Sequence, residues 1–120
     1  MNTTRHPLPR AYGQDGRLIF TCVVLPATFI ARLRGLLGHR EPRVHEAWWF
    51  SSCSAVHTFG MAFPIDVLHL ARDGRILRIC ASVQPSRISA CRAGTQVVEL
   101  RDGAAAQLGL HVGYRLEVQR

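Results

Sequence analysis

The sequence has 120 residues, of which 15 are basic and 8 are acidic, giving a formal net charge of +7 at pH 7. This length suits one domain with a single core, and an apolar content of 48% excludes a disordered chain. All the basic residues are arginines, and they are scattered from Arg5 to Arg120. A nucleic-acid-binding face normally clusters its basic residues, so the charge disfavours nucleic acid and favours other anionic partners only weakly.

The N-terminal part of the chain gives no sign of a membrane segment. Residues 1–16 are polar and contain proline and glycine, so we expect a flexible tail before a single globular domain at residues 17–120. The apolar run from Leu18 to Ala31 is too short to cross a bilayer. We therefore expect a cytoplasmic protein that does not enter a membrane.

Two elements are predicted within this N-terminal part. Residues 17–25 are rich in Val, Ile, Phe and Thr, which predicts a strand. Apolar residues at helical spacing predict a helix over residues 27–37, with Gly38 as its C-terminal stop. Arg32 flanks the apolar face of this helix, where it is available to bind an anion or to pair with Asp66.

A short aromatic strand is predicted at residues 47–50. Successive side chains of a strand point to opposite faces, so we expect one of Trp48 and Trp49 to face the core and the other to lie at a rim. An exposed indole can mark a binding surface, and Trp49 is a candidate ligand-binding residue.

The stretch 53–71 holds more chemically capable side chains than any other. If residues 55–61 form a strand, His57 and Met61 share one face and Thr58 lies on the other. His57 has two interpretations. It is either a structural histidine at the edge of the core, or it lines a cleft together with Thr58 where the chain turns. Met61 is a candidate ligand contact on the same face.

Asp66 and His69 belong to the next predicted strand, at residues 65–71. Asp66 is in phase with two leucines, and a carboxylate on an apolar face is costly unless it is paired or hydrogen-bonded. We favour a structural role, in which Asp66 accepts hydrogen bonds from backbone N–H groups of the preceding loop. The alternative is a functional partner for His57 or for an arginine. We expect His69 to be half exposed.

The second half of the chain predicts short strands joined by turns. Asp-Gly at residues 73–74 predicts a hairpin between residues 65–71 and 75–83. The remaining predictions are a long loop at 84–94, a strand at 95–100, a short helix at 103–109 and a final strand at 114–118. With about six strands and two short helices, the predicted fold class is mainly β (α+β), a small antiparallel partial barrel.

The four cysteines are single and widely spaced, at positions 22, 53, 80 and 91. No C-x-x-C pair is present, so the spacing of a zinc ribbon is absent. We interpret the cysteines as reduced, small buried hydrophobes, and we predict no metal and no cofactor.

Five segments resemble a known family in their order along the chain: RLRGLLG at 32–38, VHTFGMAFPIDVL at 56–68, DGRIL at 73–77, VVEL at 97–100 and GLHVG at 109–113. Together they resemble domain-of-unknown-function family 192, a set of small prokaryotic proteins, over residues 20–119. The resemblance implies a compact β-rich domain, found alone or behind export signals, and no established activity or catalytic residue. The sequence departs from the family pattern at His39, at Arg101-Asp102 and at Tyr114.

The residues of this sequence are compatible with three functions. The favoured hypothesis is a binding module for a small polar or anionic ligand or a protein partner, with a cleft near His57-Thr58 and Asp66. The alternative is a hydrolase-like or metal-dependent enzyme, in which His57 and Asp66 supply a general base and its orienting group and Cys53 or Ser54 a nucleophile. Nucleic-acid binding through the scattered arginines ranks last.

Overall fold

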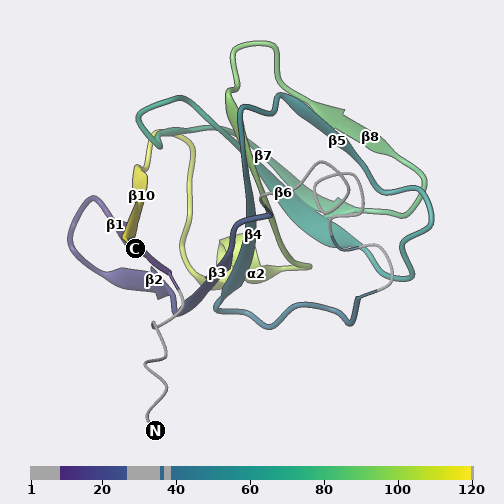
Figure 1. The fold of residues 1–120 in the computed structure, drawn as a ribbon, viewed down its shortest axis with the longest axis horizontal. Helices are drawn as coiled ribbons and strands as arrows, with labels where there is room; N and C mark the ends of the chain where they lie inside the picture. The colour runs from purple at the N-terminus through teal and green to yellow at the C-terminus, as the bar shows by residue number, and fades with distance from the viewer. Residues whose placement is uncertain (1–8, 27–35, 37–38, 120) are drawn as a thin grey trace, which may run out of the picture.

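The computed structural model describes residues 9–26, 36 and 39–119. Within them the chain forms ten strands and one short helix (Figure 1). In chain order these are β1 (Arg10–Gly13), β2 (Leu18–Phe20), β3 (Cys22–Val24), β4 (Glu46–Ser51), β5 (Ala55–His57), β6 (Ile65–Leu70), β7 (Ile76–Val83), β8 (Ile88–Ala90), β9 (Gln96–Arg101), α2 (Ala104–Gln107) and β10 (Leu116–Gln119).

The strands are arranged in three sheets. A five-stranded sheet has the order β3-β4-β9-β6-β7, a three-stranded sheet has the order β10-β1-β2, and β5 pairs with β8 alone. All pairs are antiparallel except β3 with β4, which is parallel. Figure 1 shows the three-stranded sheet and the β5–β8 pair at opposite ends of the molecule. The mainly β class is confirmed, although the described strands do not close into a barrel and outnumber the six expected.

The strand expected at residues 17–25 is in fact two strands that belong to different sheets. The chain bends at Thr21, where the backbone N–H groups of Thr21 and Cys22 both donate to the carbonyl of His45, at 3.0 and 3.3 Å. Before the bend, β2 joins the three-stranded sheet, and after it β3 joins the five-stranded sheet. One short segment therefore connects the two sheets.

Other boundaries differ from the sequence prediction. Strand β1 lies within residues 1–16, where a loose tail was expected, because it pairs on both sides with β2 and β10. Strand β8 lies within residues 84–94, where a long loop was expected. The helix predicted at 103–109 is the shorter α2. The helix predicted at 27–37 lies outside the described residues apart from Leu36.

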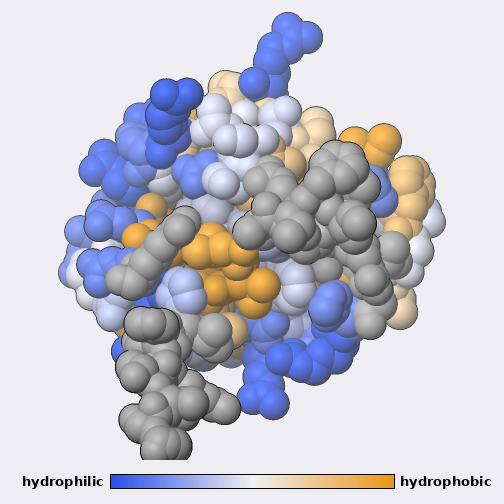
Figure 2. All heavy atoms as spheres, viewed as in Figure 1, coloured by the Kyte–Doolittle hydropathy of each residue, from blue (hydrophilic) through white to orange (hydrophobic). Residues whose placement is uncertain are grey.

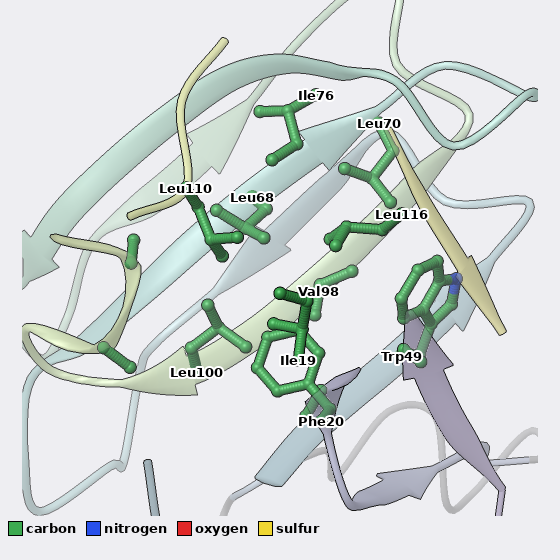
Figure 3. Close-up of a cluster of buried hydrophobic side chains, with 14 of the residues drawn as sticks. Ile19, Phe20, Trp49, Leu68, Leu70, Ile76, Val98, Leu100, Leu110 and Leu116 are labelled. Atoms are coloured by element: carbon green, nitrogen blue, oxygen red, sulfur yellow. The ribbon is translucent and has the colours of Figure 1, made fainter. Parts of the chain in front are cut away.

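Two hydrophobic clusters lie on opposite faces of the five-stranded sheet. The first contains Leu68 and Leu70 of β6, together with Ile19, Phe20 and other residues of the three-stranded sheet and α2 (Figure 3). The second contains Ile65 and Val67 of β6, which point the other way. Strand β6 is consequently buried on both faces along its whole length. The two polar side chains of β6, Asp66 and His69, are therefore both buried.

The β6–β7 hairpin forms where Asp73-Gly74 predicted it. The backbone N–H of Ala71 donates to the carbonyl of Arg75 at 2.9 Å, and Gly74 has a φ of 90°. A Cβ atom on Gly74 would lie 2.0 Å from the carbonyl oxygen of Leu116. Two constraints therefore require glycine at position 74: the left-handed backbone conformation and the close approach of β10.

Candidate functional site

The β5–β8 pair, named here the β5–β8 ribbon, covers the second hydrophobic cluster. Val56 and Ser89 face each other in the register of the ribbon and both point inward. Val56 packs against the second cluster, and Ser89 reaches a histidine of the sheet below. The neighbouring pair of His57 and Ile88 therefore points outward to solvent.

Thr58 fixes the ribbon to the turn that precedes β8. Its hydroxyl is buried, donates to the carbonyl of Gln84 at 2.7 Å and accepts from the backbone N–H of Arg87 at 2.9 Å. The carbonyl of Thr58 also accepts from the N–H of Ser86, which has a φ of 66°. The N–H of Thr58 in turn donates to the carbonyl of Arg87 at 2.9 Å, so Thr58 joins the end of β5 to this loop through both its backbone and its side chain.

His57 lies on the outer face of the ribbon and not in the core. Its ring stacks on Phe59, with the ring centroids 5.3 Å apart and an interplanar angle of 30°. Met61, expected on the same strand face, lies beyond the end of β5 and is buried in the second cluster. The turn at Gly60, which has a φ of 82°, separates the two side chains.

Asp66 is completely buried and holds two segments in place. One carboxylate oxygen accepts from the backbone N–H of Ser82 at 2.9 Å, and the other accepts from the N–H of Ala105 at 2.9 Å. The structural role favoured from the sequence agrees with this geometry, but the donors lie in β7 and α2 and not in the preceding loop. The partners of Asp66 are backbone amides, so no His57–Asp66 pair is formed.

The remaining candidates from the sequence are separated from this region. Trp49 is buried in the first cluster, where its indole N–H donates to the side-chain carbonyl of Gln96 at 2.8 Å. One edge of Trp49 lines a pocket of about 250 Å³ between β4, β10 and the β6–β7 turn. Trp48 is the half-buried tryptophan, and its indole N–H donates to Glu46 at 3.0 Å. Arg32 lies outside the described residues.

His69 is fully buried, contrary to the half-exposed position expected from strand alternation. The ribbon covers the sheet face on which it lies, and its Nε2 is 2.7 Å from the hydroxyl of Ser89 on β8. Burial lowers the pKa of His69, and the positive charge of Arg78 on the neighbouring strand lowers it further. His69 is consequently a neutral imidazole at neutral pH.

Glu99 is the residue that sequence reasoning missed. It is only 4% exposed, at the middle of β9, with Trp48 and Val67 as its neighbours in register on the two flanking strands. Burial raises the pKa of the Glu99 carboxyl to about 7. The signal in the sequence was a carboxylate within the apolar run Val97-Val98-Glu99-Leu100, which by itself predicted only a strand.

Within residues 9–26, 36 and 39–119, three buried side-chain atoms have no hydrogen-bond partner: Nδ1 of His69, Oγ1 of Thr95 and Oε1 of Glu99. The register places these residues in a row on one sheet face, with His69 in the middle and with Thr95 and Glu99 about 13 Å apart along the chain. His69 faces Val97 across β6 and β9, and Thr95 and Glu99 precede and follow Val97 by two residues. Diagonal neighbours on one sheet face lie within about 8 Å of each other.

Two contacts support the same grouping, named here the polar cluster (His69, Thr95 and Glu99). The backbone N–H of Thr95 donates to the carbonyl of Leu70 at 2.9 Å, which fixes it beside β6. A Cβ atom on the preceding Gly94 would lie 3.5 Å from the Cβ of His69. The polar cluster thus presents three unpaired polar atoms on the sheet face that carries the second hydrophobic cluster.

The described part of the chain contains no group of three or more His, Cys, Asp or Glu side chains placed to hold a metal ion. No helix in it is both long and apolar enough to cross a membrane.

Comparison with known proteins identifies the family. The sequence model of DUF192, "Uncharacterized ACR, COG1430", matches residues 11–118. A protein of unknown function from Novosphingobium aromaticivorans DSM 12444 has a similar structure, with a TM-score of 0.77 and 24% identity, over 91% of this chain and 82% of that one. No protein with a curated function matches the chain.

Two other solved structures are similar. A protein from Sinorhizobium meliloti 1021, named as a candidate transcription regulator, gives a TM-score of 0.78 and 27% identity, over 92% of this chain and 91% of that one. A protein from Burkholderia pseudomallei K96243, named as a candidate exported protein, gives 0.50 and 17%, over 92% of this chain and 24% of that one. The cytoplasmic location expected from the sequence stays a prediction.

Proposed function

We propose that this chain, which belongs to the DUF192 family, is a binding module for a small polar ligand held at the polar cluster. The observation that carries the proposal is a row of three buried, unpaired polar atoms on one face of the sheet, among the described residues. A buried polar group without a partner costs about 1 to 3 kcal/mol, so three together call for an explanation. A ligand that pairs with them supplies one.

The chemistry of the three groups favours a ligand with mixed hydrogen-bonding capacity. A carboxyl with a pKa of about 7 is part protonated at neutral pH, so Glu99 can donate or accept a hydrogen bond. The Thr95 hydroxyl has the same versatility, and the tautomer of neutral His69 sets whether Nδ1 donates or accepts. Half-buried Trp48 and the buried Phe50 of the second cluster offer apolar surface to the rest of the ligand.

A hydrolytic function is supported less well. The hydroxyl of Ser89 and Nε2 of His69 have the separation of a nucleophile and its general base, at 2.7 Å. However, both residues are buried, and Nδ1 of His69 has no carboxylate partner within the described chain. The group that orients the base in a Ser-His-acid triad is therefore missing from the geometry.

Nucleic-acid binding is also less well supported. The Sinorhizobium meliloti protein is named as a candidate transcription regulator, but that name describes the relative and not this chain. Three arginines in the described part, Arg40, Arg101 and Arg115, are paired with carboxylates. These three are already neutralised by a neighbouring carboxylate, so they are less available to a phosphate backbone than unpaired arginines.

The proposal is tested with the variant Glu99→Leu, which keeps an apolar side chain at this position and removes the carboxyl. Glu117→Gln on the exposed face of β10 is the control. Native and denatured masses of the gently purified proteins are compared. Thermal unfolding is then followed with benzylamine, benzamide and benzoate, three probes that share a ring and differ in charge. We expect a retained mass, or a probe that raises Tm, in the wild type and the control but not in Glu99→Leu.

Two results would overturn the proposal. One is a bare monomer mass for every protein together with no probe that raises Tm. The other is an equal response of wild type and Glu99→Leu. In either case ordered water is the better partner for the three atoms. Glu99→Leu is expected to fold, because replacing a buried unpaired carboxyl by an apolar side chain is neutral or stabilising.

A further inference from the structure

The outer face of the β5–β8 ribbon is an exposed hydrophobic surface that the polar cluster does not use. Phe59 is 49% exposed and Ile88 is 68% exposed. His57 lies between them, directly opposite Ile88 in register and stacked on Phe59. Figure 2 shows hydrophobic atoms at this edge of the molecule, over β5 and β8. The three side chains form one surface, named here the ribbon surface.

The charge around the ribbon surface has one sign. The segments that build it, residues 51–64 and 84–95, contain no aspartate and no glutamate, although they contain Arg87 and Arg92. Both arginines are exposed, and the guanidinium of Arg87 donates to the carbonyl of Ser86 at 3.2 Å. The ion pairs of the described chain lie on other elements. The surface is therefore apolar and positively charged, which complements an acidic, apolar partner.

The ribbon also has a strand edge available for pairing. The N–H of Thr58 donates to the carbonyl of Arg87, and the N–H of Cys91 donates to the carbonyl of Ser54. In an antiparallel ladder the backbone N–H and C=O groups of every second residue point to the partner strand. Those of Ser54 and Thr58 point to β8, so those of Ala55 and His57 point away from it. Among the described strands β5 pairs with β8 alone.

We infer that the ribbon surface binds an extended acidic segment of a partner protein, which adds to the edge of β5 as a third strand. The N–H of Ala55 and the backbone groups of His57 pair with the added strand, as in other cases of strand addition, and the carbonyl of Ala55 exchanges its bond from the Cys53 thiol, at 3.2 Å, for one from the segment. Apolar side chains of the segment contact Phe59 and Ile88, and its carboxylates lie near the arginines. The interaction is independent of the ligand proposed for the polar cluster.

The test uses the whole chain and a short extended peptide of alternating glutamate and leucine, labelled with a fluorophore. The comparison peptide carries lysine in place of glutamate. Ile88→Asp removes the apolar contact and opposes the charge of the peptide. Val112→Asp is the matched control, because Val112 is 61% exposed and lies outside the ribbon. We expect Ile88→Asp to weaken binding by about tenfold or more and Val112→Asp to leave it unchanged.

Hydrogen exchange separates strand addition from attraction by charge alone. Binding of the glutamate peptide is expected to slow exchange at the amides of Ala55 and His57, which the ladder with β8 leaves free. The inference is overturned if the lysine peptide binds equally well, if Ile88→Asp and Val112→Asp behave alike, or if the two amides are not protected. It is also overturned if the wild type dimerises through this surface without any peptide, because a second copy is then the occupant.

Discussion

Asp66 shows how one buried carboxylate can organise two segments distant in the sequence. Both of its oxygens accept backbone hydrogen bonds, from Ser82 in β7 and from Ala105 in α2. The β6–β7 register shifts between Ile65 and Val67, which leaves the N–H of Ser82 outside the regular ladder. The N–H of Ala105 lies in the first turn of α2, where backbone N–H groups have no partner within the helix. The carboxylate therefore completes the hydrogen bonding of a bulge and of the helix beside it.

The first prediction concerns this residue. Asp66→Asn keeps the shape of the side chain, but its NH₂ group must face one of the two backbone N–H groups. We expect the free energy of unfolding to fall by about 3 kcal/mol, the scale of a lost charged hydrogen bond with a buried donor left unpaired. Urea unfolding measures the change. Asp73→Asn in the exposed hairpin turn is the control, and an equal loss in the two variants would contradict this role for Asp66.

Asp66 and His69 illustrate what the sequence could and could not predict at the residue scale. The structural role of Asp66 was predictable, since its position in phase with leucines required hydrogen-bond donors nearby. Their identity was not, because Ser82 and Ala105 come close only when three elements pack. His69 was misjudged for a similar reason. Alternation along one strand says which residues share a face, but not that a ribbon from elsewhere covers that face.

At the scale of elements, the β6–β7 hairpin depends on a single glycine in two ways. Gly74 and Gly103 both have positive φ, at 90° and 85°. A Cβ atom on Gly74 would collide with the backbone of β10, whereas a Cβ atom on Gly103 meets nothing within 4 Å. An alanine at position 103 would therefore meet backbone strain alone, whereas an alanine at position 74 would meet both backbone strain and a steric collision.

The second prediction uses this pair. Gly103→Ala is expected to lower the free energy of unfolding by about 1 kcal/mol, the cost of a left-handed backbone for alanine. Gly74→Ala should cost several times more, because the turn or β10 must also move. Thermal unfolding of both variants measures the difference. Equal losses would mean that β10 gives way easily and that the close approach to Leu116 is not a constraint.

The elements that the sequence identified are those whose signal is local. Asp73-Gly74 between alternating residues is sufficient for a hairpin, and both of its strands were found. Strands β1 and β8 were missed because each is short and lies among proline, glycine or serine, and each is stabilised by a partner far away in the sequence. The bend at Thr21 was missed because the residues on either side are equally suited to a strand.

At the scale of the whole molecule, two buried groups change the free energy of unfolding with pH in opposite directions. The pKa of Glu99 is 4.5 when unfolded and about 7 when folded, so the folded chain keeps a proton that the unfolded chain releases. Stability therefore falls as the pH rises from 4.5 to 7, by about 3 kcal/mol in total from this group. The folded pKa of His69 lies below 6.5, so His69 removes stability as the pH falls below 6.5.

The third prediction follows from these signs. Glu99→Gln should abolish the fall in the free energy of unfolding as the pH rises from 4.5 to 7. His69→Gln should reduce the fall in the free energy of unfolding as the pH drops below 6.5. Chemical unfolding at a series of pH values between 4.5 and 7 measures both slopes. A wild-type slope that persists in Glu99→Gln would contradict the assignment of the raised pKa to this carboxyl.

The pairing of β1 with β10 has a consequence for the order in which the protein is assembled. Arg10 lies opposite Gln119, so the first and last described strands are neighbours in one sheet. On a ribosome, β1 has no partner on that side until almost the whole described chain has been made, which takes about 5 to 20 s at ordinary rates of synthesis. During that interval Ile19 and Phe20 of the adjoining β2 await the residues of β10 that help to bury them. We therefore expect the three-stranded sheet to be the last to be completed during synthesis, with β2 accessible to chaperones until β10 emerges.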